Sequence, residues 1–445
     1  MTKMQAIKAE DLNRMEETYR QNDKARVVRN ALTNNDITRI SSVFEAEEAN
    51  PFLFSIDIKT MPATNQKKSG RCWIFSSLNV LREMIAKKYH IEKFELSQNF
   101  ITFYDKLEKV NWFLEAALQE VDTPYSDETM RYLLETVTND GGQWDMMVSV
   151  VKKYGLCPKT AMPETFQSSN TRGMMRLING RLRKFVADSK RINAEGKKEE
   201  LQALKEECLQ ECYGVLCSCL GVPPKSFTFE YVDEKKKYHA VYNVTPKQFY
   251  EKYLGTDLDD YVGIINGPTE DKPFHKMYTV KYLGNVVDGN PVSYLNLPMN
   301  EFKKLIIDQL KDGSIVWFGC DAGKDINRDS GLWDDGQFDY AGTFDMDLEM
   351  SKAEMLDARH SAMNHAMVLT GVNLVKGKPN RWKIENSWGD QVAHAGYYIC
   401  TDTWFDKYVF EAVVHRKYLN AKQAKALKSE PVVLQPWDPF GSLAD

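Results

Sequence analysis

One cysteine of this 445-residue chain lies among neighbours that favour reactivity. Cys72 stands in the stretch QKKSGRCWIF, residues 66–75, directly after Arg71 and at the start of an apolar segment. The thiolate is the nucleophilic form of cysteine, and a helix N-terminus or a nearby positive charge lowers the pKa of a thiol. The position of Cys72 therefore indicates a nucleophile, whereas a buried cysteine without such neighbours would only pack as a small apolar side chain.

A cysteine nucleophile needs a histidine that a third group holds in one orientation. His365 opens the apolar segment HAMVLTGV, and Asn386 ends the segment RWKIEN on the far side of the turn KGKPN. Two adjacent antiparallel strands would bring these side chains together. The Asn386 carbonyl could then accept the imidazole N–H, and Trp388 could shield that bond from water. We therefore predict a site made of one cysteine, one histidine and one asparagine.

Two other histidines near these motifs are weaker candidates for the base. His360 precedes the strand in DARHSAMN and is expected in an exposed loop. His394 follows the asparagine segment in GDQVAHAGYY, where we expect it to support the structure. The predicted base is therefore His365.

The elements that must position these residues change in kind along the chain. The segment from 72 to 90, CWIFSSLNVLREMIAKKYH, has apolar residues at helical spacing and two lysines in its last turn, which predicts a helix that begins at Cys72. A second helical region is predicted over 171–220, stopped by GVPP. The last third contains SIVWFGC, HAMVLTGVNLV, RWKIENSW and GYYICT between turn residues, which predicts an antiparallel sheet.

Helices first and strands last predict an α+β fold of two packed lobes with a cleft between them. We expect five parts. These are an N-terminal arm (1–60), a helical catalytic lobe that carries the cysteine (61–170), a helical insertion (171–290), a β-rich catalytic lobe that carries the histidine and the asparagine (291–420), and a C-terminal arm (421–445).

The composition argues against several classes of protein. Hydrophobic residues make up 43% and charged residues 27%, as in ordinary globular proteins, and the formal net charge of −5 gives no global attraction to nucleic acid. No secretory signal and no membrane span are visible, so eight cysteines favour reduced thiols in the cytoplasm. We expect neither a metal nor a cofactor, since the cysteine cluster has no C-x-x-C pair and no nearby histidine. That cluster, expected to pack as apolar side chains, comprises Cys208, Cys212, Cys217 and Cys219.

Four segments resemble those of the papain-type cysteine peptidases. They are QKKSGRCW (66–73), NDGGQWDMM (139–147), NHA (364–366) and ENSWG (385–389). The resemblance implies that Cys72 is the nucleophile, His365 the general base and acid, and Asn386 the group that orients it. It further implies that the Gln66 side chain and the Cys72 N–H form the oxyanion hole, and that Gly141 and Gly142 bind the backbone of an extended substrate.

Departures from papain narrow the family. About 290 residues separate Cys72 from His365, whereas papain-type enzymes have about 130 to 150, and Arg71 replaces the small residue common before the cysteine. Along essentially its whole length the chain resembles bleomycin hydrolase and the bacterial aminopeptidase C group. That resemblance implies a cytoplasmic, homohexameric thiol aminopeptidase for peptide substrates, with active sites that face an internal cavity. It also implies that the C-terminal arm lies in the cleft, where the terminal carboxylate of Asp445 faces the α-ammonium of the substrate.

Three other functions are compatible with parts of the sequence. A papain-like endopeptidase would share every motif. A transglutaminase-like acyl transferase also uses a cysteine and a histidine but typically an aspartate as the third member, so Asn386 argues against it. A nucleic-acid-binding or scaffold protein with a vestigial peptidase site is disfavoured by the mildly acidic balance, and a steep salt dependence of DNA binding would be its mark.

Overall fold

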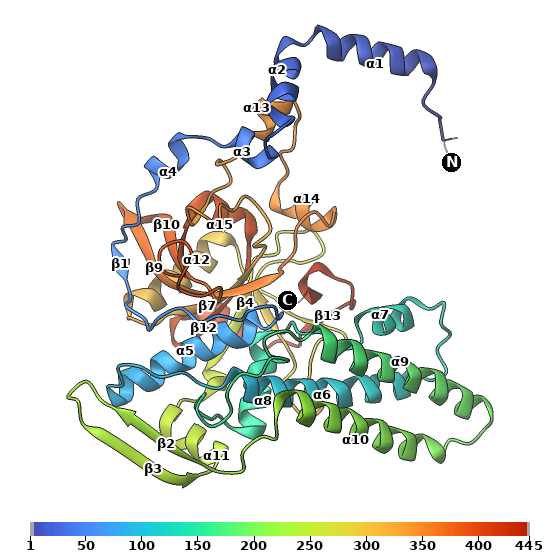
Figure 1. Ribbon diagram of the computed structural model, residues 1–445, viewed down its shortest axis with the longest axis vertical. Coiled ribbons are helices and arrows are strands. Elements are labelled where there is room, and N and C mark those ends of the chain that lie inside the picture. Colours follow the sequence, from blue (N-terminus) through green and yellow to red (C-terminus); the bar gives the residue numbers. More distant parts are fainter. Residues whose placement is uncertain (1–3, 443–445) are drawn as a thin grey trace.

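The computed structural model describes residues 4–442 and shows two lobes that lie against each other, with an arm that extends from one of them (Figure 1). One lobe is helical and the other surrounds a large sheet. No helix within residues 4–442 is long and apolar enough to cross a membrane. The elements are those of an α+β fold.

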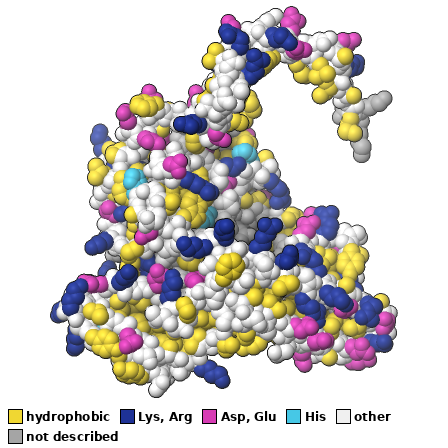
Figure 2. Space-filling model, in the orientation of Figure 1, with side chains coloured by type: hydrophobic (Ala, Val, Ile, Leu, Met, Phe, Trp, Pro, Cys, Tyr) yellow, Lys and Arg dark blue, Asp and Glu magenta, His cyan; other side chains and the backbone are white. Residues whose placement is uncertain are grey.

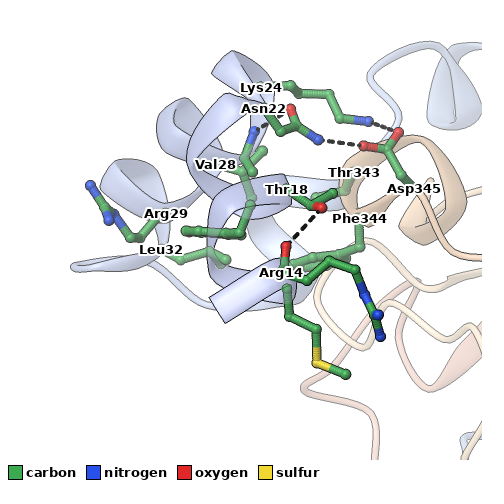
Figure 3. Close-up of a pocket in the computed structure, with 13 residues that line it drawn as sticks. Arg14, Thr18, Asn22, Lys24, Val28, Arg29, Leu32, Thr343, Phe344 and Asp345 are labelled. Atoms are coloured by element: carbon green, nitrogen blue, oxygen red, sulfur yellow. Dashed lines mark hydrogen bonds and ion pairs between the residues drawn. The ribbon is translucent and has the colours of Figure 1, made fainter. Parts of the chain in front are cut away.

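The arm at the N-terminus consists of short helices with exposed side chains. Charged residues alternate with isolated apolar ones here, so α1 and α2 bury no residue (Figure 2). Lys24 and Asn22 both contact the carboxylate of Asp345, and a cavity of about 600 Å³ lies between these helices and α13 (Figure 3). The elements are α1 (Ala9–Gln21), α2 (Asp23–Leu32), α3 (Ile37–Ser41), α4 (Glu45–Ala49), β1 (Ile56–Asp57) and α13 (Tyr340–Phe344).

Helix α5 (Cys72–Tyr89) joins the two lobes. It begins at Cys72, as predicted, and ends at His90 in the left-handed conformation, with Lys87 and Lys88 in its last turn. Residues on all sides of its first four turns are buried, because the sheet covers one side and other helices cover the opposite side. The predicted apolar face is therefore part of a helix that is buried all round.

The helical lobe packs around α6 (Gln98–Gln119). Helices α9 and α10 lie side by side as a hairpin against it (Figure 1). Cys208 and Cys212 are buried on α10, where they pack in the main hydrophobic cluster as expected. The other helices of this lobe are α7 (Glu128–Thr136), α8 (Trp144–Tyr154), α9 (Arg172–Ala194) and α10 (Glu200–Leu220).

The prediction of a helical region over 171–290 is wrong after Leu220, where strands alternate with only short helices. The segments that follow are rich in aromatic and β-branched residues, and strand pairing decides their structure. The hairpin β2–β3 comes first, and β4 and β5 then join the large sheet. The division of the chain into five parts stays a prediction. The elements here are β2 (Phe227–Val232), β3 (Tyr238–Val244), α11 (Pro246–Phe249), the π-helix η1 (Tyr250–Leu254), the 3-10 helix η2 (Leu258–Asp260), β4 (Tyr261–Ile265) and β5 (Met277–Val280).

The large sheet has the strand order β13-β5-β6-β4-β12-β7-β9-β10-β11-β8, and β1 also pairs with β9. Its centre is antiparallel, as predicted, and three parallel pairs, β4–β6, β5–β13 and β8–β11, lie toward its ends. Those pairs join strands whose connections cross over through other elements rather than through a tight turn. The remaining strands are β6 (Tyr294–Asn296), β7 (Val316–Cys320), β8 (Leu332–Trp333), β9 (His365–Val375), β10 (Lys378–Glu385), β11 (Tyr397–Thr401), β12 (Val409–His415) and β13 (Val432–Leu434).

Both faces of the centre of this sheet are covered. In β9, Ala366 and Val368 belong to the cluster that contains α5, whereas Met367 and Leu369 belong to the cluster that contains α12. A strand buried on both faces reads as a continuous apolar run, which explains HAMVLTGV. The remaining helices are α12 (Met299–Lys311), α14 (Lys352–Asp357), α15 (Asp402–Tyr408), α16 (Ala421–Ala426), and the 3-10 helices η3 (Arg416–Tyr418) and η4 (Pro439–Gly441).

Candidate active site

The neighbouring strands β9 and β10 bring His365 and Asn386 together. His365 is the first residue of β9, and Asn386 directly follows β10. The distance from His365 Nε2 to Asn386 Oδ1 is 2.9 Å. The Trp388 ring stacks on the imidazole with the ring centres 5.2 Å apart. The predicted pairing is therefore observed, with the tryptophan beside it.

Burial decides the protonation of this histidine. His365 is 5% exposed, and burial lowers the pKa of its imidazole to about 4. The hydrogen bond to Asn386 opposes this shift, and the charge of Arg328 adds to it. At neutral pH His365 is thus a neutral imidazole held through Nε2, which can accept a proton at its other nitrogen.

Cys72 lies at the boundary of the lobes, near the start of β9. Helix α5 packs against β7 and β9, and Cys320, the last residue of β7, pairs with His365. Burial raises the pKa of Cys320 well above its usual value, and the charges of Asp321, Cys400 and Cys72 add to this effect. Cys72 therefore lies close to Cys320, the residue that pairs with His365 on the neighbouring strand. Its side chain is buried at the N-terminus of α5, where the helix dipole favours a thiolate.

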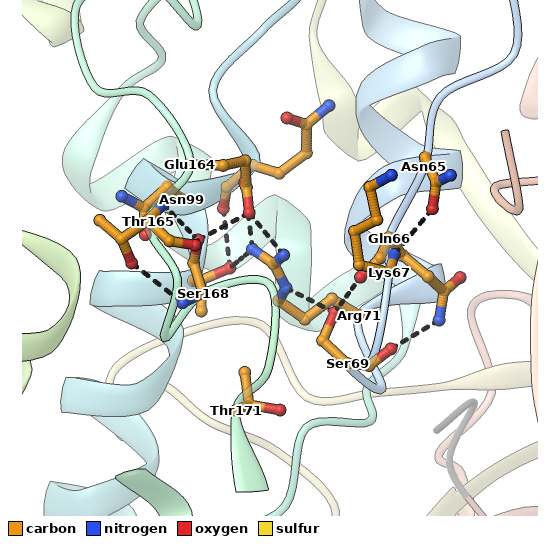
Figure 4. Close-up of polar contacts among 12 residues, drawn as sticks. Asn65, Gln66, Lys67, Ser69, Arg71, Asn99, Glu164, Thr165, Ser168 and Thr171 are labelled. Atoms are coloured by element: carbon orange, nitrogen blue, oxygen red, sulfur yellow. Dashed lines mark hydrogen bonds and ion pairs between the residues drawn. The ribbon is translucent and has the colours of Figure 1, made fainter. Parts of the chain in front are cut away.

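Arg71 is the positively charged residue next to Cys72 in the sequence. In the structure its charge is paired with a carboxylate, so it does not act on the Cys72 thiol as an unpaired charge would. Arg71 is fully buried, and its Nη2 lies 2.7 Å from Glu164 Oε2, so a carboxylate offsets its charge (Figure 4). Its Nε also donates to Ser69 Oγ at 2.9 Å, and Ser69 Oγ donates to the Gln66 carbonyl at 2.7 Å. Arg71 therefore fixes the loop that leads to Cys72.

The side-chain amide of Gln66 is held from both ends. Its Nε2 donates to the Ser69 carbonyl at 2.7 Å, and its Oε1 accepts from Ser387 Oγ at 2.6 Å. The backbone N–H of Gln66 also donates to the Ser387 carbonyl, at 2.9 Å. Ser387 follows Asn386 directly, so Gln66 reaches the same end of β10 as the histidine pair. An amide nitrogen carries two N–H groups, which gives Gln66 a second donor.

The segment with Gly141 and Gly142 lies against Trp73, the residue after Cys72. Trp73 Nε1 donates to the Asp140 carbonyl at 2.7 Å, and a Cβ at Gly142 would lie 2.5 Å from the Trp73 ring. Only glycine permits this close approach. Buried lysines hold the segment from the other side, since Lys109 Nζ donates to the Gly141 carbonyl and lies 5.3 Å from the centre of the Trp73 ring.

Two networks of buried charges near the site had no signal in the sequence. Lys106 and Lys109 both contact the Asn139 carbonyl and Asp105, and burial lowers the pKa of Lys109 to about 8. Further along α5, Arg82 Nη2 lies 3.2 Å from Oε1 of Glu385, the residue that precedes Asn386. Charged residues are usually solvated, so sequence reasoning assigns them to the surface.

The C-terminal segment also reaches the site. Ser442 Oγ donates to the Met363 carbonyl at 2.6 Å, and Gln143 Nε2 donates to the Ser442 carbonyl at 3.2 Å. Phe440 is buried, and a Cβ at Gly267 would lie 2.6 Å from its ring. Ser442 therefore lies between Met363, which precedes His365, and Gln143, which follows Gly142. Asp445 lies outside the described residues.

The two histidines that were not predicted to act as the base, His360 and His394, lie where expected. His360 is exposed beside Lys324, and His394 stacks on Phe52 with ring centres 4.1 Å apart. Within residues 4–442 no cluster of His, Cys, Asp and Glu could hold a metal ion.

An α+β fold in two lobes, with a cysteine at a helix N-terminus beside a His–Asn pair, is that of the papain-like cysteine peptidases. The model of the Peptidase C1-like family matches residues 6–441. The chain belongs to this family.

Individual relatives agree along the chain. Aminopeptidase C of Lactobacillus delbrueckii subsp. lactis is 45% identical over 422 residues, which is 94% of each chain. Aminopeptidase C of Listeria monocytogenes serovar 1/2a is 43% identical over 435 residues, 98% of each. The crystal structure of PepW from Lactobacillus rhamnosis HN001 is 43% identical, covers 99% of each chain and gives a TM-score of 0.97. The resemblance drawn from the sequence and the papain-like fold are confirmed.

The burial of His365 makes stability depend on pH. Between pH 6.5 and about 4 the unfolded chain protonates this histidine while the folded protein keeps it neutral, so stability falls as the pH falls. The loss reaches about 3 kcal/mol, since each pKa unit is worth about 1.36 kcal/mol. Denaturant unfolding at both pH values should show that wild type loses about 3 kcal/mol more than His365→Gln. Equal losses in the two proteins would contradict this.

The Arg71–Glu164 pair should be costly to break. Arg71→Met leaves the carboxylate of Glu164 without its ion pair, and Glu164→Gln leaves a buried guanidinium uncompensated, so each should destabilise the fold by about 3 kcal/mol or more. The double variant removes both charges and should recover part of this loss in a double-mutant cycle. Additive effects, measured by denaturant unfolding, would show that the pair does not fix the loop.

Proposed function

We propose that this protein is a cysteine aminopeptidase, which removes N-terminal residues from peptides. The observation that carries the proposal is the His365–Asn386 pair at the N-terminus of a helix that begins with Cys72, in a chain 43 to 45% identical to aminopeptidases C over nearly its whole length. An asparagine as the third member favours peptide hydrolysis over the transglutaminase-like alternative.

The reaction would run through an acyl-enzyme. His365 takes the proton of Cys72, and the thiolate attacks the scissile carbonyl carbon to form a C–S bond. The imidazolium then gives its proton to the departing amine as the C–N bond breaks. Water, deprotonated by the same imidazole, attacks the thioester carbonyl carbon. The C–S bond then breaks, which releases the N-terminal residue, and the proton returns from the imidazolium to the Cys72 sulfur. Asn386 keeps the ring in one orientation throughout, and Trp388 limits access of water to their hydrogen bond.

The oxyanion would be stabilised by two donors, the second N–H of Gln66 Nε2 and the backbone N–H of Cys72. Each donor of this kind is worth about 3 kcal/mol of barrier. The support for Gln66 is its fixed amide, held by Ser69 and Ser387. Gly141 and Gly142 would bind the backbone of the substrate, supported by the lysine that holds the Gly141 carbonyl.

The C-terminal arm would set the exopeptidase specificity. Its contacts with Met363 and Gln143 support a position on the acyl side of the site, where it would leave room for few substrate residues. An ionised carboxylate of Asp445 there would attract the α-ammonium of the substrate in a partly desolvated place. This support favours an aminopeptidase over an endopeptidase.

Location and assembly belong to the same proposal. A cytoplasmic enzyme is supported by the eight cysteines, which are thiols in the structure. A homohexamer with enclosed active sites rests on the family resemblance alone.

Matched fluorogenic amides with free and acetylated N-termini test the proposal. We expect rapid cleavage of the free-amine substrate, slow cleavage of the acetylated one, and no cleavage of either by Cys72→Ala. Cys208→Ala is the control, because that thiol only packs on α10, and it should keep its activity. Equal cleavage of both substrates would indicate an endopeptidase, and an active Cys72→Ala would remove the nucleophile.

Deletion of residues 441–445 tests the arm. The shortened enzyme should cleave free-amine substrates less well and acetylated or longer peptides better, because the cleft opens and the carboxylate is lost. Asp445→Asn separates the side chain from the terminal carboxylate. An unchanged preference for free amines after deletion would exclude the arm as the determinant.

A further inference from the structure

An exposed arginine lies over the tryptophan of the site. Arg328 belongs to the segment between β7 and β8, and its Cζ is 4.7 Å from the centre of the Trp388 ring. The same ring stacks on His365. Arg328 is therefore fixed against the site by a cation–π contact.

This guanidinium has no acidic partner in the part of the chain that the structure describes, residues 4–442. The buried arginines near the site behave differently, since Arg71 pairs with Glu164 and Arg82 with Glu385. Burial is the main influence on the pKa values of His365 and Tyr398, and the charge of Arg328 lowers both. An unpaired cation with five N–H donors, held beside a reacting centre, is suited to bind an anionic group of a ligand.

Arg328 and the described part of the C-terminal arm contact different parts of the site. The arm reaches Met363 and Gln143, beside the glycine segment. Trp388 instead bridges to Asn65, which precedes Gln66, so Arg328 lies on the Gln66 side. If the arm bounds the acyl part of the substrate, the departing part must extend toward Trp388 and Arg328.

We propose that Arg328 binds the C-terminal carboxylate of the departing peptide, which makes dipeptides and tripeptides with a free C-terminus the substrate class of this site. The inference rests on the proposed aminopeptidase function and deepens it. The carboxylate is the one charge that every unmodified peptide carries at that end, and a guanidinium can bind it with two parallel hydrogen bonds.

The distances set the length of these substrates. The guanidinium lies within about 10 Å of the imidazole, by way of the tryptophan ring between them, and each extended residue spans about 3.3–3.6 Å. A leaving group of one or two residues brings its carboxylate to Arg328. Longer peptides carry their carboxylate past it and gain nothing from it.

The test compares each peptide with its own C-terminal amide. Release of leucine from Ala-Leu and of leucinamide from Ala-Leu-amide is followed by chromatography, together with a pentapeptide and its amide. Wild type should favour the dipeptide acid about fivefold in kcat/KM, mainly through KM, as expected for an exposed ion pair. Wild type should show no preference between the two pentapeptides.

Three variants separate binding from support of the fold. Arg328→Met should remove the preference for the acid, Arg328→Lys should keep part of it, and Arg176→Met, which removes an exposed arginine from α9, should leave it unchanged. Any effect of Arg328 on the pKa of His365 changes both substrates equally and cancels in the ratio. The ratio of kcat/KM for the peptide acid to that for its amide should also stay constant from pH 6 to 8, since guanidinium and peptide carboxylate groups are ionised throughout this range.

Each result has one meaning. If wild type cleaves free-amine substrates without preferring the acid, or if the preference survives Arg328→Met, the proposed role of Arg328 is overturned. The proposal that the protein is an aminopeptidase then stays intact. An acid preference equally strong for the pentapeptide would overturn the length limit. A wild-type enzyme that cleaves none of these peptides would overturn both proposals.

Discussion

The burial of helix α5 on all sides is the constraint on which the site depends. A helix covered by a sheet on one side and by helices on the other cannot rotate or slide without opening the main hydrophobic cluster of the protein. Its N-terminal residue is therefore held at the end of β9, where His365 begins the strand. The same packing excludes water, so the imidazole stays neutral and the helix dipole meets the thiol in a poorly screened environment.

Buried charges then tie each part of the site to this helix. Arg71, at the start of α5, holds the Gln66 loop, and Arg82, further along the helix, pairs with the residue that precedes Asn386. The lysine network below Trp73 holds the glycine segment. Replacing both members of a buried ion pair by apolar residues of similar volume often costs no stability. Their directional hydrogen bonds, however, place a loop, a strand end and a glycine segment around one thiol, which apolar packing would do less specifically.

The sequence was sufficient for the family and for the central strands, because short motifs with strict spacing carried both. Cys72 at a helix start and the antiparallel strands of His365 and Asn386 agree with the structure. The register was not predictable, since the pairing of β9 with β10 shifts by one residue between Lys383 and Ile384, close to the end of β10 that precedes Asn386. Strands β4 and β5 were missed within a region read as helical, because their pairing with β12 and β6 is decided by residues far away in the chain. Buried lysines and arginines look like surface residues until their partners are known.

The C-terminal arm and Arg328, which contact different parts of the site, are held in place by different kinds of contact. The arm is fixed by buried contacts, with Phe440 against Gly267 and Lys272 Nζ 2.8 Å from Asp438 Oδ2. Arg328, in contrast, is exposed, and its guanidinium lies against the aromatic face of Trp388. In the proposed function, a rigid arm would set how many residues precede the scissile bond, because displacing it would break the Lys272–Asp438 ion pair. An exposed cation tolerates varied side chains and is screened by salt. If both proposals hold, such a site would select the ends of a short peptide more strongly than its side chains.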